Sequence, residues 1–341
     1  MQNAALESMM YRKLCLLLMV FALSSCSLDA VESTNLTAKG MQFYAQGMMS
    51  KAEDAFKMAI EKDAKNDQAQ YRLGIMRTQA RDYSEAARYF KRSVELKPDE
   101  AQYHYMLASV LLSQGESLRD EADAALAKSL LDDAAKSFVR TIELDPYYAE
   151  AHLKLARVYR AGMDLQKAAV AYEQSIHANP KLMTDDAAPT AVAYKELGML
   201  YADYGFNIEA ARVLLNGVQN NPMDAQLETE LANIYLELRQ YTDALLHFKK
   251  AFDLFQSHNA DRLDLVLPTV YGVGISNYWK AKEAQHNSKT AEAIDLYKEA
   301  KTWLDKFALN AAAPEMMGQR AAAQGYVAEI REVLMTLEGK K

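Results

Sequence analysis

The histidines are the first candidates for chemistry, because an imidazole can bind metal ions or transfer protons near neutral pH. None of them belongs to an HExxH pattern or to a spaced set of His, Cys and Asp ligands. We therefore assign all of them to surface or packing roles. The six residues are His104, His152, His177, His247, His258 and His286.

The other short patterns do not indicate catalysis either. Gly272 and Gly274 begin a GxG pattern, but no third glycine follows, so nucleotide binding has no support. The adjacent acids Asp132 and Asp133 are solvated charges, because neighbouring helix positions do not face each other. Neither a GxSxG sequence nor a P-loop occurs. The sequence thus predicts a protein that is not an enzyme and that uses no metal and no cofactor.

A cysteine near the N-terminus could undergo a different reaction, which is acylation. Arg12 and Lys13 precede an apolar run over Leu14–Leu23, and this order of charged and apolar regions is typical of a secretory signal. The run ends in the letters LSSC, of which the last is Cys26. The only other cysteine, Cys15, lies inside the apolar run and would be removed with it. The mature chain would then contain no disulfide.

The LSSC sequence resembles a bacterial lipobox. The resemblance implies a signal peptide over residues 1–25, cleavage before Cys26 and acylation of Cys26. Several acyl chains, each contributing about 0.8 kcal/mol per buried CH2, would hold the mature chain on a membrane. Leu28 stands where an aspartate would retain such a protein in the inner membrane, so we expect the outer membrane, facing the periplasm. The alternative is an ordinary cleaved signal that leaves Cys26 free.

Composition limits the class of partner. The chain has 50% hydrophobic and 25% charged residues, which is typical of a folded globular protein. Its formal net charge is −7, and lysine and arginine are spread along the chain without forming a basic stripe. A nucleic acid is therefore not an expected partner.

The body of the chain repeats with a period of about 34 residues. The clearest copy covers residues 67–100 and contains Leu73-Gly74, Ala86, Phe90 and Pro98 at regular spacing. This pattern resembles the tetratricopeptide repeat, in which two antiparallel helices pack through small residues and a proline ends the second helix. The resemblance implies an all-α superhelical solenoid of about seven helix-turn-helix repeats with a C-terminal capping helix.

The repeat register divides the chain into the following predicted segments. They are a signal peptide (1–25), a short tether after Cys26 (26–32), the repeats over 33–258, a divergent long hairpin (259–310), and a capping helix and tail (311–341). The individual repeats are 33–66, 67–100, the elongated 101–148, 149–182, 191–224 and 225–258.

The elongated repeat leaves two alternatives for its turn. It is about 14 residues longer than the others, which could be divided as about seven in each helix, because seven residues are close to two helical turns. Alternatively the turn lies at Gly115, with Ser117 and Asp120 as a capping box before a much longer second helix. The segment Met183–Thr190 interrupts the register as a loop or a short helix extension.

The family resemblance also implies which residues line the concave groove. The first half of the expected wall is aromatic and apolar and the middle is basic, which predicts a peptide ligand with hydrophobic anchors and an acidic group. For each residue, packing between neighbouring helices is the alternative role. The wall residues are Met41, Tyr44, Tyr71, Ile75, Tyr105, Leu112, Arg157, Arg160, Lys195, Met199 and Asn233.

These features predict a scaffold that binds a protein partner through the groove or through the elongated third repeat. The lipobox together with the repeats is similar to the pilotin-type lipoproteins that assist assembly of type IV pilus secretins. A second scaffold hypothesis is an adaptor for enzymes of the cell wall. The contrasting class is an enzyme or a glycan-binding accessory protein that uses the groove.

Overall fold

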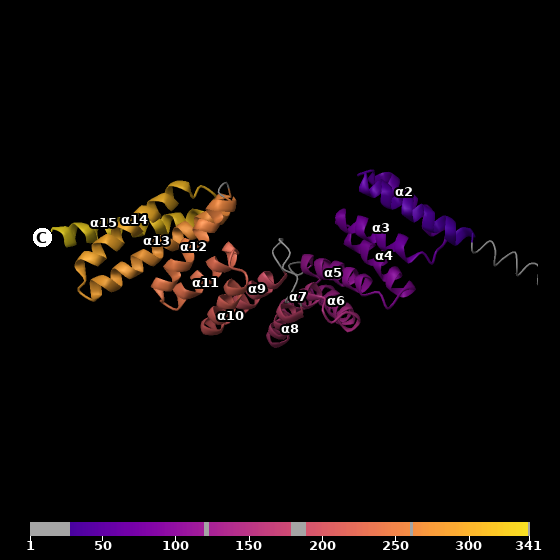
Figure 1. Ribbon diagram of the computed structural model, residues 1–341, viewed down its shortest axis with the longest axis horizontal. Coiled ribbons are helices and arrows are strands. Elements are labelled where there is room, and N and C mark those ends of the chain that lie inside the picture. The colour runs from indigo at the N-terminus through magenta and orange to yellow at the C-terminus, as the bar shows by residue number, and fades with distance from the viewer. Residues whose placement is uncertain (1–27, 119–122, 179–188, 260–261, 340–341) are drawn as a thin grey trace, which may run out of the picture. The chain divides into compact units, whose positions relative to one another are not determined.

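The computed structural model describes residues 28–118, 123–178, 189–259 and 262–339, and helices joined by turns account for most of them (Figure 1). No β-strand occurs in these ranges. The predicted all-α architecture of consecutive helix hairpins is confirmed. The signal peptide, Cys26, Asp120 and nearly all of Met183–Thr190 lie outside the described residues.

The helices follow one another in pairs that match the repeat. The first covers residues 28–45. The others are α2 (Met49–Lys62), α3 (Asp67–Gln79), α4 (Tyr83–Leu96), α5 (Ala101–Ser117), α6 (Ala124–Leu144), α7 (Ala149–Ala161), α8 (Leu165–Ala178), α9 (Pro189–Asp203), α10 (Asn207–Asn220), α11 (Ala225–Glu237), α12 (Tyr241–Asn259), α13 (Leu263–His286), α14 (Thr290–Asn310), a 3-10 turn (Pro314–Met316) and α15 (Met317–Glu338).

The chain forms two compact units, residues 1–168 and 169–341, and we describe each by itself. In the first unit, α2 packs against α3, and each helix up to α7 packs against its successor. In the second unit the same order holds from α9 to α15. Each hairpin buries the apolar stripes of its helices against the hairpins next to it, which is how repeat proteins build a continuous core.

Within a hairpin, a small residue of the first helix admits a large side chain of the second. A Cβ atom placed on Gly40 would lie 2.6 Å from the ring of Phe56, and one on Gly74 would lie 2.6 Å from the ring of Phe90. Because both rings are fully buried, a larger residue at either glycine would overpack the hairpin. The small-to-aromatic spacing seen in the sequence is therefore a packing contact.

Two of the turns between hairpins are closed by a histidine. The Nε2 atom of His104 lies 2.9 Å from the carbonyl oxygen of Pro98, and that of His152 lies 3.1 Å from the carbonyl oxygen of Pro146. Proline ends the preceding helix, and the histidine of the next helix then bonds its carbonyl group. These two histidines therefore have the packing role that we expected.

The elongated third hairpin divides its extra length between both helices. Gly115 lies inside α5 and packs against Leu131 of α6, so it does not form the turn. Ser117 is the last residue of α5, and its hydroxyl group donates to the carbonyl oxygen of Gln114. The capping-box alternative is therefore wrong, because Ser117 ends one helix instead of beginning the next.

The predicted tether over residues 26–32 is wrong from residue 28 onward, because the chain is already helical there. A buried polar network fixes this helix to the rest of the first unit. The hydroxyl group of Ser33 donates to the carbonyl oxygen of Ala59 over 2.7 Å, and the Asn66 amide donates to the hydroxyl oxygens of Ser33 and Thr37 over 2.7 and 2.9 Å. Hydroxyl and amide groups are weak indicators of a helix in the sequence, which is why we expected a tether.

The last hairpin, α13 with α14, is longer than the regular repeats and is covered by α15. A Cβ atom on Gly274 would lie 2.8 Å from Leu304 of α14, and one on Gly272 would overlap the ring of Phe248 in α12. The GxG pattern thus serves helix packing. From α15, the Tyr326 ring packs on that of Tyr278 with centroids 4.7 Å apart. The predicted capping helix is present as α15.

Candidate functional site

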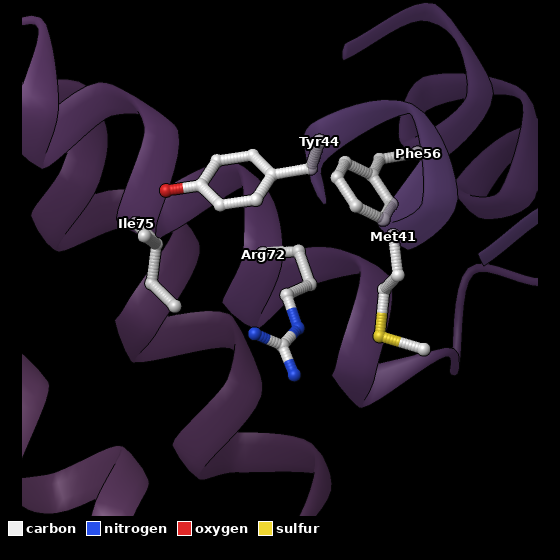
Figure 2. Close-up of a pocket in the computed structure, with 5 residues that line it drawn as sticks. All are labelled: Met41, Tyr44, Phe56, Arg72 and Ile75. Atoms are coloured by element: carbon white, nitrogen blue, oxygen red, sulfur yellow. The ribbon is translucent and has the colours of Figure 1, made fainter. Parts of the chain in front are cut away.

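A concave site lies between the first two hairpins, in the first unit. It is a pocket of about 280 Å³ lined by Met41, Tyr44, Phe56, Arg72 and Ile75. Figure 2 shows the Arg72 side chain below the Tyr44 ring, between Ile75 on one side and Met41 on the other. The site is therefore apolar on most sides and contains one cation.

Local helix geometry explains why these side chains meet. Met41 and Tyr44 are three positions apart on the first helix, and Arg72 and Ile75 are three positions apart on α3, so each pair shares one helix face. Phe56 of α2 reaches the pocket because Gly40 leaves room for its ring. The sequence thus builds the pocket from two parallel helix faces and an aromatic base.

The charge of Arg72 is only partly compensated. Its Nε atom is buried and has no hydrogen-bond partner among the described residues. Its guanidinium group lies 5.6 Å from the centroid of the Tyr71 ring, a cation–π contact that leaves the N–H donors available. An arginine in apolar surroundings binds carboxylates strongly and in a defined orientation, because its planar donors match the two oxygens.

A second, more polar depression of about 440 Å³ adjoins the pocket through Met41. Hydroxyl, amide and carboxyl groups at its edge come from the first helix and from the start of α3. Asp67 at this edge accepts a hydrogen bond from Tyr103, so it belongs to the inter-hairpin packing as well. The lining residues are Ala30, Thr34, Thr37, Ala38, Met41, Asp63, Lys65, Asn66, Asp67 and Gln68. Together the two depressions give a ligand an apolar end and a polar end.

Three of the predicted groove residues, Met41, Tyr44 and Ile75, meet in this pocket. Arg157 and Arg160 are partly exposed on α7, away from it. In the second unit, Lys195 donates to the Gln226 side chain over 2.7 Å. Also in that unit, Met199 is partly buried in α9 and Asn233 is exposed on α11.

The other three predicted groove residues, Tyr71, Tyr105 and Leu112, belong to the core. Their exposed fractions are 9%, 8% and 5%. The Tyr71 ring packs on that of Tyr103 at 4.9 Å, and the Tyr105 ring stacks on that of Tyr148 at 4.8 Å. Because aromatic rings of one hairpin stack on those of the next, these side chains present little surface to a ligand.

Sequence reasoning missed Phe56 and Arg72. Phe56 was not among the expected groove residues, although the spacing from Gly40 could have indicated its place beside the first helix. Arg72 lies one position after Tyr71, outside the positions that the family resemblance assigns to the groove. The sequence feature that could have indicated its role is a single cation between the apolar side chains of Tyr71 and Leu73.

A basic spot in the third and fourth repeats has an internal role. The Lys154 amino group donates to the Ser109 hydroxyl oxygen over 3.1 Å and lies 4.9 Å from the Tyr105 ring centroid. Burial lowers the pKa of Lys154, although the Glu150 carboxylate opposes this shift. The Tyr105 hydroxyl donates to Glu150 over 2.9 Å. Both this bond and the bond from Lys154 to Ser109 join the third repeat to the fourth.

A buried carboxylate in the second unit is also fully engaged. Glu228 of α11 lies 2.6 Å from Nδ1 of His247 and pairs with Lys250, both on α12. Burial opposes ionisation of Glu228, but the contacts with His247 and Lys250 outweigh it and lower the pKa of that carboxyl group. The stabilisation is therefore present above the carboxyl group's ordinary pKa and is lost as the pH falls through the lowered value.

Two searches for other kinds of site gave negative results within the described ranges. No group of three or more His, Cys, Asp or Glu side chains there could hold a metal ion. Among the helices of that same part of the chain, none is both long and apolar enough to cross a bilayer.

Stacked helix hairpins with a pocket between their first helices define a helical-repeat binding protein. Two models of tetratricopeptide repeats match the sequence, one at residues 43–110 and the other at 119–182. The matched residues contain tetratricopeptide repeats. Proteins of this family are generally scaffolds without catalytic activity, and the fold indicates protein partners.

The chain is also similar to solved structures of tetratricopeptide repeat proteins. A tetratricopeptide repeat protein from Parabacteroides merdae is 14% identical, with a TM-score of 0.50 over 88% of this chain and 99% of that one. A thermophilic repeat protein from Thermus thermophilus is 20% identical, with a TM-score of 0.43 over 60% of this chain and 99% of that one. YrrB, described as having an unusual peptide-binding site, is 17% identical, with a TM-score of 0.44 over 63% and 97%. A search of curated proteins gave no match.

Proposed function

We propose that this protein is a membrane-anchored scaffold of the bacterial envelope that binds a partner protein through the pocket of Met41, Tyr44, Phe56, Arg72 and Ile75. The observation that carries the proposal is the buried Arg72 Nε atom, which has no hydrogen-bond partner within the described ranges, in an otherwise apolar pocket. The ligand is a segment of the partner that supplies one large apolar side chain and one carboxylate.

The size of the pocket favours a side chain over a free cofactor. Pockets for small-molecule ligands range from about 300 to 1,000 Å³. At about 280 Å³ this pocket is at the lower end of that range, and it shares Met41 with the neighbouring polar depression. An apolar anchor can fill it while the adjoining main chain continues along the polar depression.

The cation supplies orientation and selectivity. A hydrogen bond to a charged group contributes about 1.5–3 kcal/mol when it forms in a partly buried site. The Nε atom itself is buried, so a ligand carboxylate would meet the guanidinium group on the side that faces the pocket.

The cellular setting is part of the proposal. The signal sequence and the lipobox that ends at Cys26 support a lipid anchor, with the outer membrane facing the periplasm as the favoured location. The similarity to pilotin-type lipoproteins supports a role in assembly of a type IV pilus secretin. An adaptor for cell-wall enzymes is the alternative use of the same pocket.

The affinity test compares two fluorescent peptides that differ only by an aspartate or an asparagine next to a leucine. We expect the aspartate peptide to bind more tightly and the substitution Arg72→Gln to lower its affinity about 10- to 100-fold, because one or two charged hydrogen bonds are lost. Arg88→Gln is the matched control, since Arg88 is exposed on α4 and pairs with Glu85 of its own helix. Thermal melts show whether both variants fold.

Two outcomes would contradict this proposal: equal binding of the two peptides, or no effect of Arg72→Gln in a folded variant. In cells, a photo-crosslinking residue at Met41 followed by mass spectrometry would identify the partner. A secretin would support the pilus role, and a peptidoglycan enzyme would support the alternative.

A further inference from the structure

We infer that the N-terminal end of the first hairpin lies on the lipid surface, with Leu28 and Val31 in contact with the membrane. The inference rests on the proposed acylation of Cys26. It adds an orientation to the anchor, because it states which face of the protein touches the bilayer.

The first observation is an exposed apolar face at the start of the first helix. Leu28 is 70% exposed and Val31 is 60% exposed. They are three positions apart on a helix and therefore project from the same side. Isolated apolar residues on a surface are ordinary, but two on one face directly at a membrane anchor form a contact site.

The second observation is that no spacer is available between this face and the anchor. Only Ser27 separates Cys26 from Leu28, and the chain is helical from residue 28. Two residues span at most about 7 Å, whereas a free tether over 26–32 would span about 25 Å. An acylated Cys26 must therefore hold Leu28 close to the bilayer interface.

The third observation is that several polar side chains of this helix end are engaged within the hairpin. Ser33 and Thr37 point into the polar network with Asn66. Glu32 pairs with Lys62 of α2 over 2.8 Å. Leu28 and Val31 are exposed, so they can face lipid without breaking any of these contacts.

The two ends of the repeat array differ in a way that agrees with this inference. A terminal repeat needs a polar outer face or a cap. The C-terminal end has α15, which buries Ala323, Val327 and Ile330 against the last hairpin. The N-terminal helix instead exposes Leu28 and Val31, and the bilayer would cover them.

The charges near this face show what kind of contact it is. Asp29 and Glu32 flank the apolar pair, so the face is not basic and does not attract anionic lipids. The acyl chains supply the attachment, and Leu28 and Val31 need only enter the interface to fix the tilt of the helix.

The inference also places the pocket. Met41 and Tyr44 are 13 and 16 residues after Leu28, which corresponds to about 20–24 Å along the helix. The pocket would be held within about 30 Å of the bilayer, so the partner segment that reaches it would be close to the membrane.

The test uses the full-length lipoprotein in vesicles of phosphatidylethanolamine and phosphatidylglycerol. Because Cys15 is removed and Cys26 is acylated, a cysteine introduced by Val31→Cys or Leu28→Cys is the only free thiol for an environment-sensitive dye. Met163→Cys is the control, since Met163 is 76% exposed in the turn before α8. Vesicles with a brominated lipid quench dyes that enter the interface.

We expect at least a two-fold greater quenching at positions 28 and 31 than at 163, and a blue-shifted emission at both. Quenching equal to that at 163 in an acylated protein would overturn the contact and leave the anchor intact. If the cysteine at position 31 is protected from labelling in native envelopes but not in vesicles, the membrane contact would also be overturned. A partner protein would then cover this face. Mass spectrometry that finds no acyl group on Cys26 would overturn the anchor and, with it, this inference.

Discussion

The first two hairpins and the last hairpin both use glycines to admit a large neighbouring side chain, but the first two keep an open surface and the last is covered. In the first two, Gly40 and Gly74 each admit one ring of their own hairpin, and the faces of the first helices remain open as the pocket. In the last, Gly272 admits a ring from α12 and Gly274 admits Leu304 of α14, and α15 then covers the hairpin. A small residue sets how closely helices approach, and the next element determines whether the surface stays open.

The two regions also differ in their unsatisfied polar groups. At the open end the Arg72 guanidinium group, whose buried Nε atom has no partner among the described residues, lines a pocket that a ligand can enter. At the closed end Asn277 is wholly buried in α13, and both atoms of its amide lack a partner among the described residues. The first group can be satisfied by binding, whereas the second can only reduce the stability of the fold.

The largest effect is expected at the closed end. The substitution Gly272→Ala should lower the free energy of unfolding by about 1–3 kcal/mol, because the new methyl group overlaps the Phe248 ring. That ring shares a buried cluster with Ala232 and Ala244 and has little room to move. The measurement is a denaturant melt.

The matched control for Gly272→Ala is Gly325→Ala in α15, where nothing lies within 4 Å of the added methyl group. That variant should gain about 0.5–1 kcal/mol, because alanine loses less backbone freedom than glycine in a helix. Equal stability of the two variants would show that Phe248 has room to relax.

A smaller effect of opposite sign is expected at Asn277. The substitution Asn277→Leu should raise the free energy of unfolding by about 1 kcal/mol, because it removes an amide that is buried without partners. Asn310→Leu at the end of α14 is the control and should give no gain, because Asn310 is exposed and bonded to the Lys306 carbonyl oxygen. A loss of stability in Asn277→Leu would mean that the amide has a partner such as a bound water.

The smallest effect concerns the turns of the first and last hairpins. Gly47 and Ser288 occupy these turns with φ angles of 74° and 61°, in the left-handed region. We expect Ser288→Gly to gain about 0.5 kcal/mol, because the strain relieved exceeds the added entropy of the unfolded chain. Gly47→Ser should lose a similar amount in the same melt. A loss of stability in Ser288→Gly or a gain in Gly47→Ser would contradict the assignment of strain.

The fold could be predicted from the sequence where the contacts join residues that are close together in the chain. The spacing of Gly74, Ala86 and Phe90 reports contacts within one hairpin, so a single copy of the repeat already indicates the pair of helices. The length of the first helix was not predictable in this way, since its start depends on the network of Ser33 and Thr37 with the distant Asn66.

The candidate site was predictable only in part. Met41, Tyr44 and Ile75 were expected in the groove and do line the pocket. Tyr71 was expected there too, but its ring packs on Tyr103 of the following hairpin. Arg72 was missed, because the rotation of one hairpin on the next determines which of two adjacent side chains faces the pocket.

The sequence by itself determined the repeated hairpins and the small residues at their closest contacts, and it predicts the signal that ends at Cys26. Each of these depends on residues that are near one another in the chain or on a short motif. Only the tertiary structure decided that the N-terminal end carries an open pocket with Arg72 and that the C-terminal end is covered. The reason is that an open or closed face depends on which helix packs next, and that contact joins residues of different repeats.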